Sequence, residues 1–355
     1  MKIWFRRGHL AIGILTVFFL ANLSISGALL VFGKQIQHYL QPNYWLVTVK
    51  DDPLPLSQLV ANVETASGKT VEHIRLSSKA EHAWQFQLNN HDNISVNPFN
   101  GSILHQYSEY GNFYRFVMSW HRWLLLTDDT GKKPLQVLVS ITSLLLIIEI
   151  LLGLWLWLKP KNRFKRLRID LKARPRIKYL QLHTVIGLFS CIPLVLIALS
   201  GMAFHWQSQT KSVVEFLVGE SIEHYQHPKI TAGSKMDLQL DLAFSQGRKA
   251  MAPGQLYRIY LPQKDQPLAL RIKMPKEFFA FSWVWINPYN AKVIKTYDAS
   301  KSNLATRIWN FKFKFHTGDF FGTGLKFIWL LLALLPGAFA ITGIYLFSQR
   351  LKESS

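Results

Sequence analysis

Residues 6–13, Arg6-Arg7-Gly8-His9-Leu10-Ala11-Ile12-Gly13, begin an apolar run that reaches about Phe32. The pattern returns as Leu180-Gln181-Leu182-His183-Thr184-Val185-Ile186-Gly187 at the start of another apolar run. Each histidine is followed 18 residues later by a glycine, Gly27 or Gly201. Because 18 residues make about five helical turns and about 27 Å of rise, each pattern predicts a helix whose histidine and glycine lie on the same face, one near each end.

Four apolar runs are long enough to cross a bilayer, which needs about 20 helical residues. They extend from about Leu10 to Phe32, Leu135 to Leu158, Leu180 to Trp206 and Leu325 to Phe347. The first run is too long for an ordinary cleaved leader, so we expect a retained helix. The sequence therefore predicts an α-helical integral membrane protein with four transmembrane helices.

The distribution of basic residues predicts the topology of these helices. The chain has a net charge of +20, and ten of its 41 lysines and arginines lie in the short connector 159–179. By the positive-inside rule this connector and both termini are cytoplasmic. We expect the connector to face anionic lipid and expect no nucleic-acid partner, because only 17% of residues are charged.

The segments between the paired runs are then periplasmic. Segment 33–134 carries equal numbers of basic and acidic residues, whereas segment 207–324 has sixteen basic and nine acidic residues. Lysines near predicted strand ends of the second segment are candidates for attracting an anionic chelate, and a merely solvated basic surface is the alternative. They are Lys273, Lys276, Lys292 and Lys295.

The periplasmic segments also repeat. Residues 96–101 (Val-Asn-Pro-Phe-Asn-Gly) parallel residues 286–291 (Ile-Asn-Pro-Tyr-Asn-Ala), and each predicts a tight turn between two strands. Helices are expected near 56–67 and 237–250, so each segment is predicted to be a small α+β domain. The expected order is two helix–domain–helix repeats. The predicted boundaries are 1–32, 33–115, 116–158, 159–179, 180–206, 207–315, 316–347 and 348–355.

Histidines occur at equivalent depths in the two repeats. His9 and His183 open outward-going helices, whereas His121 and His316 precede inward-going ones. Two axial imidazoles at one depth are what a b-type haem requires, so two haems are expected. His205 is an alternative outer ligand. Interfacial histidines without a ligand role, or a zinc site with three or four clustered ligands, are the competing interpretations.

Other residues are candidates because of their size or charge. Gly13 and Gly187 leave room for a flat macrocycle or a neighbouring helix. Arg6 and Arg122 are candidate partners of haem propionates. Glu149 is the acid within a predicted span, where a carboxyl group is costly and marks a candidate quinol site, proton relay or ligand partner. A single cysteine, Cys191, excludes a thiolate-held cluster within this chain.

The chain resembles the PepSY-associated transmembrane helix family of PiuB-like, iron-regulated inner-membrane proteins. The resemblance covers essentially the whole chain and rests on short motifs in a fixed order. They are Arg-x-x-His9-x-x-x-Gly13, Ser-Gly27, Trp-His121-Arg-Trp, Gly-Leu-Trp-Leu-Trp157, Leu-His183-x-x-x-Gly187, Ser-Gly201 and His316-Thr-Gly318.

This resemblance implies a bacterial inner-membrane protein with PepSY-type periplasmic domains, and some members of the family are haem-containing ferric-siderophore reductases. No G-x-G-x-x-G dinucleotide motif is present, so the electron donor is expected to be a cytoplasmic reductase or quinol. The leading hypothesis is an oxidoreductase that acts as a di-haem electron conduit to a ferric siderophore. Rival hypotheses are a non-enzymatic protein that binds a periplasmic partner or an iron-transport component, and a transporter permease.

Overall fold

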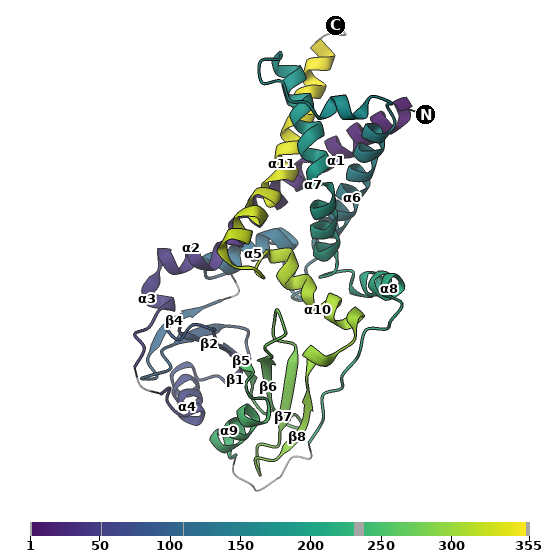
Figure 1. Ribbon diagram of the computed structural model, residues 1–355. Helices are drawn as coiled ribbons and strands as arrows, with labels where there is room; N and C mark the ends of the chain where they lie inside the picture. Colours follow the sequence, from purple (N-terminus) through teal and green to yellow (C-terminus); the bar gives the residue numbers. More distant parts are fainter. Residues whose placement is uncertain (1, 51, 109, 231–237, 353–355) are drawn as a thin grey trace. The chain divides into compact units, whose positions relative to one another are not determined.

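The chain forms two compact units, each assembled from both halves of the sequence (Figure 1). The computed structural model describes residues 2–50, 52–108, 110–230 and 238–352. The helical unit comprises Met1–Gly33, Val117–Val213 and Lys312–Ser355. The sheet unit comprises Lys34–Phe116 and Val214–Phe311.

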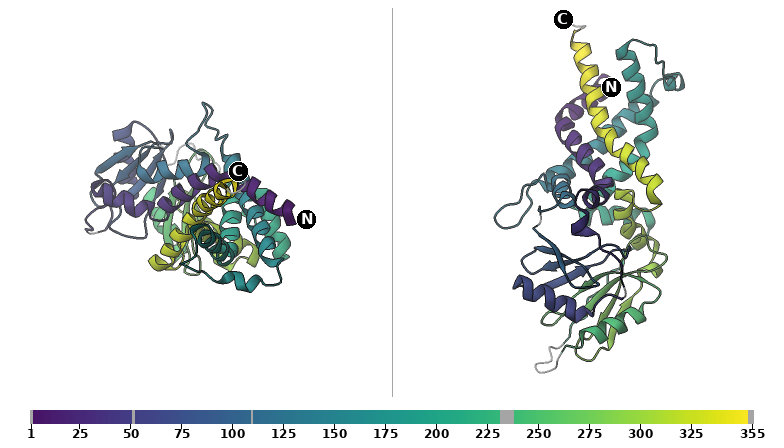
Figure 2. Two further views of the ribbon diagram at one scale, coloured as in Figure 1. Left: turned by 90° about the horizontal axis from the view of Figure 1, so that it is seen from above. Right: turned by 90° about the vertical axis from the view of Figure 1, so that its left-hand side faces the viewer.

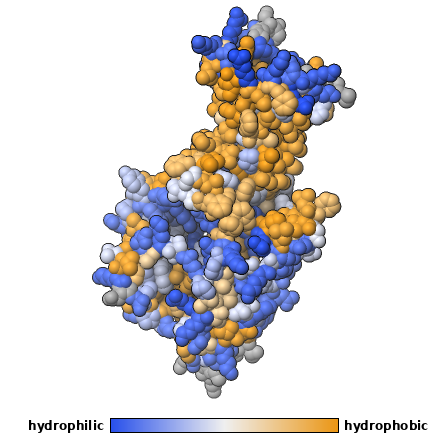
Figure 3. Space-filling model, viewed as in Figure 1, coloured by the Kyte–Doolittle hydropathy of each residue, from blue (hydrophilic) through white to orange (hydrophobic). Residues whose placement is uncertain are grey.

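Four long helices make up the core of the helical unit, and all four are apolar enough to span a membrane. They are α1 (Lys2–Val31), α6 (Gln136–Leu158), α7 (Pro175–Met202) and α11 (Gly322–Lys352). α1 and α7 each contact both α6 and α11, so α1 and α7 lie diagonally across a four-helix bundle (Figure 2). A hydrophobic band covers the visible side of this unit (Figure 3), as expected of a multi-pass membrane protein.

Three of the long helices, α1, α7 and α11, begin before the predicted apolar runs, whereas α6 begins within one residue of its run. α1 already includes Arg6 and His9, because no proline or glycine pair interrupts the chain before the apolar run. α7 begins with Pro175, whose fixed φ suits the first helical turn. Its end at Met202 leaves His205, which the predicted span included, in the following turn.

Short helices complete the structure. α5 (Phe113–Trp123) carries His121 and precedes α6, and α10 (Leu304–Thr317) carries His316 and precedes α11. The other helices are α2 (Gly33–Leu40), α3 (Pro42–Trp45), α4 (Leu56–Ser67), α8 (Gln207–Val218), α9 (Leu240–Ala250), and the 3-10 turns η1 (Arg163–Leu167) and η2 (Ala299–Lys301). The predicted helices near 56–67 and 237–250 are α4 and α9; residue 237 lies outside the described residues.

The sheet unit contains one eight-stranded antiparallel sheet in the order β4-β3-β2-β1-β5-β6-β7-β8. Strands β1–β4 come from the first periplasmic segment of the sequence prediction and β5–β8 from the second. Their bounds are β1 (Val71–Arg75), β2 (Trp84–Leu88), β3 (Asn93–Val96), β4 (Ile103–Tyr107), β5 (Gln255–Tyr260), β6 (Leu268–Lys273), β7 (Ser282–Ile286) and β8 (Val293–Tyr297).

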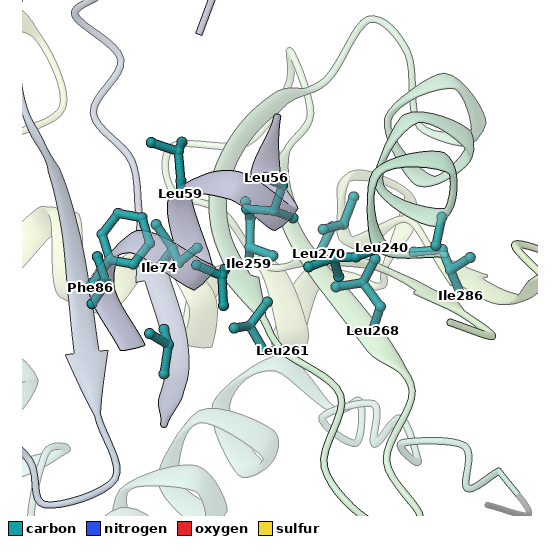
Figure 4. Packing of buried hydrophobic residues seen from close by; sticks show 14 of the residues in the cluster. Leu56, Leu59, Ile74, Phe86, Leu240, Ile259, Leu261, Leu268, Leu270 and Ile286 are labelled. Atoms are coloured by element: carbon teal, nitrogen blue, oxygen red, sulfur yellow. The ribbon is translucent and has the colours of Figure 1, made fainter. Parts of the chain in front are cut away.

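The two expected α+β modules are therefore halves of one body. β1 pairs with β5 through Ile74 opposite Ile259, and each strand would otherwise leave an unpaired edge. α4 and α9 contact each other and cover one face of the sheet, over a core that crosses the β1–β5 seam without a break (Figure 4). Phe86 and Leu270, one strand away on either side, belong to the same buried cluster.

The repeated turns adopt the predicted form. Asn97 N–H donates to the Ser102 carbonyl at 2.9 Å, and Asn287 N–H donates to the Lys292 carbonyl at the same distance. Gly101 has a φ of 73°, and a Cβ there would approach the Asn62 amide to 2.5 Å, so glycine is favoured at this turn. Ala291 takes the equivalent position of the second turn with a φ of 55°.

Replacing Ile259 by alanine should destabilise both halves of the sheet together. The side chain is fully buried at the seam, so Ile259→Ala should lower the free energy of unfolding by about 2 to 5 kcal/mol. Ile294→Ala removes the same atoms from a side chain that is 40% exposed and should have little effect. Thermal unfolding and limited proteolysis of the full chain would measure this; release of one half as a stable fragment would contradict a shared core.

Candidate functional site

Two histidines meet between the diagonal helices α1 and α7. The ring centroids of His9 and His183 are 6.3 Å apart, with the ring planes at 88°. Each histidine lies in the first third of its helix, so the two side chains occupy the same end of the bundle. We call them the α1/α7 pair.

Each ring of the α1/α7 pair is anchored through Nδ1 on a neighbouring helix. His9 Nδ1 lies 3.1 Å from the main-chain oxygen of Glu149 on α6. His183 Nδ1 lies 2.9 Å from the Thr342 hydroxyl on α11. That hydroxyl donates its own hydrogen to the Ala338 carbonyl at 2.9 Å, so it accepts from the imidazole.

A second pair lies at the other end of the bundle. The ring centroids of His121 on α5 and His316 on α10 are 6.2 Å apart, with the planes at 50°. His121 Nδ1 lies 2.9 Å from the Ser26 hydroxyl, and His316 Nδ1 lies 3.1 Å from the Ser200 hydroxyl. His316 Nδ1 also lies 3.1 Å from the Ile197 carbonyl. We call these two residues the α5/α10 pair.

These contacts bear on the tautomer of the rings. A main-chain carbonyl can only accept, so Nδ1 of His9 and His316 carries the proton. The Ser26 and Thr342 hydroxyls donate to carbonyls of their own helices at 2.6 and 2.9 Å, which favours the same tautomer for His121 and His183 and leaves the Nε2 lone pairs available. No hydrogen bond to Nε2 of the four histidines occurs in the described part of the chain. Metal-binding histidines are commonly held in this way.

The α5/α10 pair is also neutral at physiological pH. Desolvation, followed by the charges of His316 and Arg122, lowers the pKa of His121 to about 3. Desolvation also lowers the pKa of His316, against the opposing effect of its bond to the Ile197 carbonyl. The neutral imidazole, with a proton on one nitrogen only, is the form that binds metal.

The ring separations suit two ligands of one metal ion. Two nitrogens that bind one metal from opposite sides at about 2.0 Å, each about 1.1 Å from its ring centre, give centroids about 6.2 Å apart. Both pairs have this separation. Within the described ranges no group of three or more His, Cys, Asp or Glu side chains comes together, so the ligand set for the competing zinc interpretation is not found there.

Glycines make room for the α5/α10 pair. A Cβ at Gly27 would lie 3.2 Å from Cε1 of His121, and one at Gly201 would lie 3.1 Å from Cε1 of His316. The repeated Ser-Gly dipeptide therefore has one role in both repeats: the serine binds the ring, and the glycine lets it approach.

The predicted cofactor glycines Gly13 and Gly187 have other neighbours. A Cβ at Gly13 would lie 2.7 Å from the Glu149 carboxylate, and one at Gly187 would lie 3.9 Å from Phe339. Both glycines thus sit beside the side chains of α6 and α11 that flank the α1/α7 pair. The Phe339 ring packs edge-on against His183 at 5.1 Å.

The remaining candidates divide between the two ends of the bundle. His205 is exposed in the turn after α7, and its ring packs against the adjacent Trp206 rather than against His121 or His316. Arg122 lies over the Phe204 ring, and its charge depresses the pKa of both histidines of the pair. Arg6 is exposed, one helical turn before His9.

The anchoring hydroxyls were not identified as site residues from the sequence. Ser26 and Ser200 carried a usable signal, because each precedes the repeated glycine. Thr342 carried no such signal. It precedes Gly343, but the equivalent glycine of the first repeat, Gly153, follows a leucine, so no hydroxyl is repeated there.

The fold and these pairs define a four-helix membrane protein with histidine pairs at both ends of its bundle. The chain belongs to the family described as the PepSY-associated TM region, whose model matches residues 6–350. This confirms the family that the sequence motifs indicated. No curated protein matches the chain.

Enlarging Gly201 should displace His316. Because a leucine there would overlap the imidazole, Gly201→Leu should lower the free energy of unfolding by about 1 to 3 kcal/mol. Gly343→Leu is the matched control, since a Cβ at Gly343 meets no atom within 4 Å. Thermal unfolding in detergent measures both; equal effects would show that the contact with His316 is not responsible.

Proposed function

We propose that this protein is a di-haem electron conduit of the bacterial inner membrane that reduces a ferric siderophore in the periplasm. His9 and His183 would hold one b-type haem, and His121 and His316 would hold the other. The electron donor is external, either a cytoplasmic reductase or a quinol.

The matched ring separation in both pairs carries this proposal. Four histidines with free Nε2 atoms form two pairs at 6.3 and 6.2 Å, from equivalent positions of a duplicated chain. Haem, when bound, supplies a one-electron centre near each end of the bundle. The protein's own groups orient the rings, keep Nδ1 protonated and surround them with apolar helices that limit the access of water.

The basic connector and termini support the orientation. The α1/α7 pair lies at the end of the bundle that carries both termini, and the positive-inside rule makes that end cytoplasmic. Eighteen residues of α1 separate His9 from Gly27 at the α5/α10 pair, about 27 Å of helix. The two pairs thus lie near the two faces of a hydrocarbon core about 30 Å thick.

Reduction at the periplasmic end would release iron, because the hard oxygen donors of a siderophore hold Fe(III) more tightly than Fe(II). The Arg122 guanidinium at the α5/α10 pair is suited to a propionate carboxylate at that end. Exposed Arg6 is suited to the same role near the α1/α7 pair. Glu149 flanks His9 and is the candidate for contact with a quinol.

An absorption spectrum of the purified full-length protein tests the proposal. We expect a reducible Soret and α-band spectrum with about two haems per chain. His183→Ala and His316→Ala should each remove about one haem, because each leaves its pair with a single ligand. His205→Ala should retain both, since its side chain lies away from the pairs.

Two outcomes would count against the proposal. Protein made with sufficient haem supply and yet colourless would favour the non-enzymatic alternative, a membrane-anchored module that binds a periplasmic partner. Loss of a haem in His205→Ala but not in His316→Ala would show that the α5/α10 assignment is wrong.

Removing the anchoring hydroxyls should affect the two histidines of one pair unequally. Ser26 is the acceptor for His121, whereas His316 keeps the Ile197 carbonyl when Ser200 is lost. Ser26→Ala should therefore weaken haem retention about 10- to 100-fold, and Ser200→Ala should weaken it less. Haem-transfer rates to an apo-protein acceptor and the reduction potential measure this; identical behaviour of the two variants would argue against anchoring through Nδ1.

A further inference from the structure

A row of arginines crosses the centre of the sheet on the face opposite its hydrophobic core. In the cross-strand register Arg75 of β1 lies opposite Arg258 of β5, which lies opposite Arg271 of β6. Ile74, Ile259 and Leu270, on the alternate positions, point to the core beneath α4 and α9. The three guanidinium groups therefore share the other face, which we call the arginine face.

The strand positions of the arginine face carry no acidic side chain, and the Glu223 carboxylate approaches only its far edge, at the Tyr297 hydroxyl. None of the strand residues paired along its two rows is Asp or Glu; beyond the arginines they are His105, Ser95, Gln85, Trp283, Tyr297, Tyr107, Asn93, Gln87, His73, Tyr260, Ala269, Trp285 and Lys295. None of the three arginines forms an ion pair within residues 2–50, 52–108, 110–230 and 238–352. Like charges directly opposite one another in a sheet are destabilising.

Several polar atoms of this face are buried without a partner. They are Nε of Arg75, Nε of Arg258 and Nε2 of His73. Burying such atoms costs free energy, which makes a row of arginines an expensive feature for the fold alone. His73 is only 9% exposed, and desolvation, followed by the charges of Arg258, Arg75 and Arg115, lowers its pKa to about 3.

Internal contacts account for part of the row. Arg258 Nη1 donates to the Tyr260 hydroxyl at 2.9 Å, and Arg271 Nε donates to the Ala280 carbonyl at 2.6 Å. Arg271 also lies over the Trp283 ring at 5.7 Å. The Arg75 side chain forms no hydrogen bond within the described residues. A purely structural role therefore explains Arg271 best and Arg75 least.

Aromatic rings border the row on the β7 side. Trp283 and Trp285 stack at 5.8 Å, and Trp283 packs against Tyr260 at 5.3 Å. Trp283 and Trp285 are only 6% and 1% exposed, so these rings pack against the row and hold the neighbouring guanidinium group of Arg271 in place.

We propose that the arginine face binds the anionic oxygen donors of a ferric chelate, so that negatively charged chelates are the preferred substrate class. This inference rests on the proposed reductase function and specifies its substrate. Such a ligand would place its oxygen atoms against the guanidinium groups of these partly exposed arginines, and its negative charge would offset the repulsion along the row. The charge that matters is then on Arg75, Arg258 and Arg271 rather than on the lysines near the strand ends.

Binding of gallium(III) chelates to the full-length protein in detergent tests this independently of haem. Gallium(III) mimics ferric iron but is not reduced under these conditions, so a failure of electron transfer would not affect the result. A tris-catecholate complex is a trianion, whereas a tris-hydroxamate complex is neutral. We expect the trianion to bind at least about tenfold more tightly, with an affinity that falls as salt increases. Quenching of tryptophan fluorescence and calorimetry would measure both.

Charge-removing variants locate the site. Arg75→Gln and Arg258→Gln should each weaken binding of the trianion about tenfold or more, because each removes charge-assisted hydrogen bonds. Arg75→Gln should not lower the melting temperature, since it relieves repulsion in the row. Arg258→Gln also loses the hydrogen bond to Tyr260, so its binding is compared with that of Arg75→Gln at a temperature where both variants are folded. Lys292→Gln removes one charge from the exposed β7–β8 turn of the same unit and should leave binding unchanged.

Three results would overturn the proposal. They are equal affinity for the two gallium complexes, loss of binding in Lys292→Gln but not in the arginine variants, and displacement of the trianion by inorganic phosphate at similar concentration. The last would identify a general anion site. Haem loss with intact binding of the trianion would instead refute the conduit and leave the arginine face in place.

Discussion

The hydrogen bond from each Nδ1 to an acceptor on a neighbouring helix is the constraint on which both histidine pairs depend. An imidazole without this bond could rotate or exchange tautomer, and its partner ring would then face no fixed lone pair. The acceptors lie on α1, α6, α7 and α11, so every long helix contributes to orienting a ring. Packing of the bundle and geometry of the pairs are therefore inseparable. The small residues at the crossings, Gly27 and Gly201 above all, permit the approach that these bonds need.

The two repeats are equivalent in plan but not in detail. Glu149 and Phe339 occupy matching positions, four residues before Gly153 and Gly343. One presents a carboxyl group to Gly13 on α1, and the other presents a phenyl ring to Gly187 on α7. Since the anchor of His9 is a main-chain carbonyl, it survives any side-chain change at Glu149 that leaves the helix intact. The anchor of His183 is the hydroxyl of Thr342, so a substitution at Thr342 that removes the hydroxyl also removes the anchor. The α1/α7 pair therefore has a polar neighbour, Glu149, on the His9 side and an apolar neighbour, Phe339, on the His183 side.

Much of this arrangement was predictable because helical periodicity and duplication are local signals. The apolar runs, the equal depths of the histidines and the repeated turns follow from residue spacing alone, and the family motifs agree. The β1–β5 pairing was not predictable, because the two strands are some 180 residues apart and no residue pattern in either strand identifies the strand it pairs with. The arginine row depends on that pairing, since Arg75, Arg258 and Arg271 are neighbours only after the register is set. Thr342 was missed because its hydroxyl has no counterpart in the first repeat.

The seam between β1 and β5 also bears on how such a chain could arise. The first strand of one repeat pairs antiparallel with the first strand of the other, centred on Ile74 and Ile259, and the strand order reads symmetrically outward from this point. Each histidine pair likewise takes one member from each repeat. A protein with a single repeat would contain one histidine of each pair, and its strand equivalent to β1 would have an unpaired edge. It would complete both only by joining a second copy around a two-fold axis. The internal symmetry is the one that such a homodimer would have. Within a single chain the two halves can carry different residues at matching positions, as Glu149 and Phe339 show.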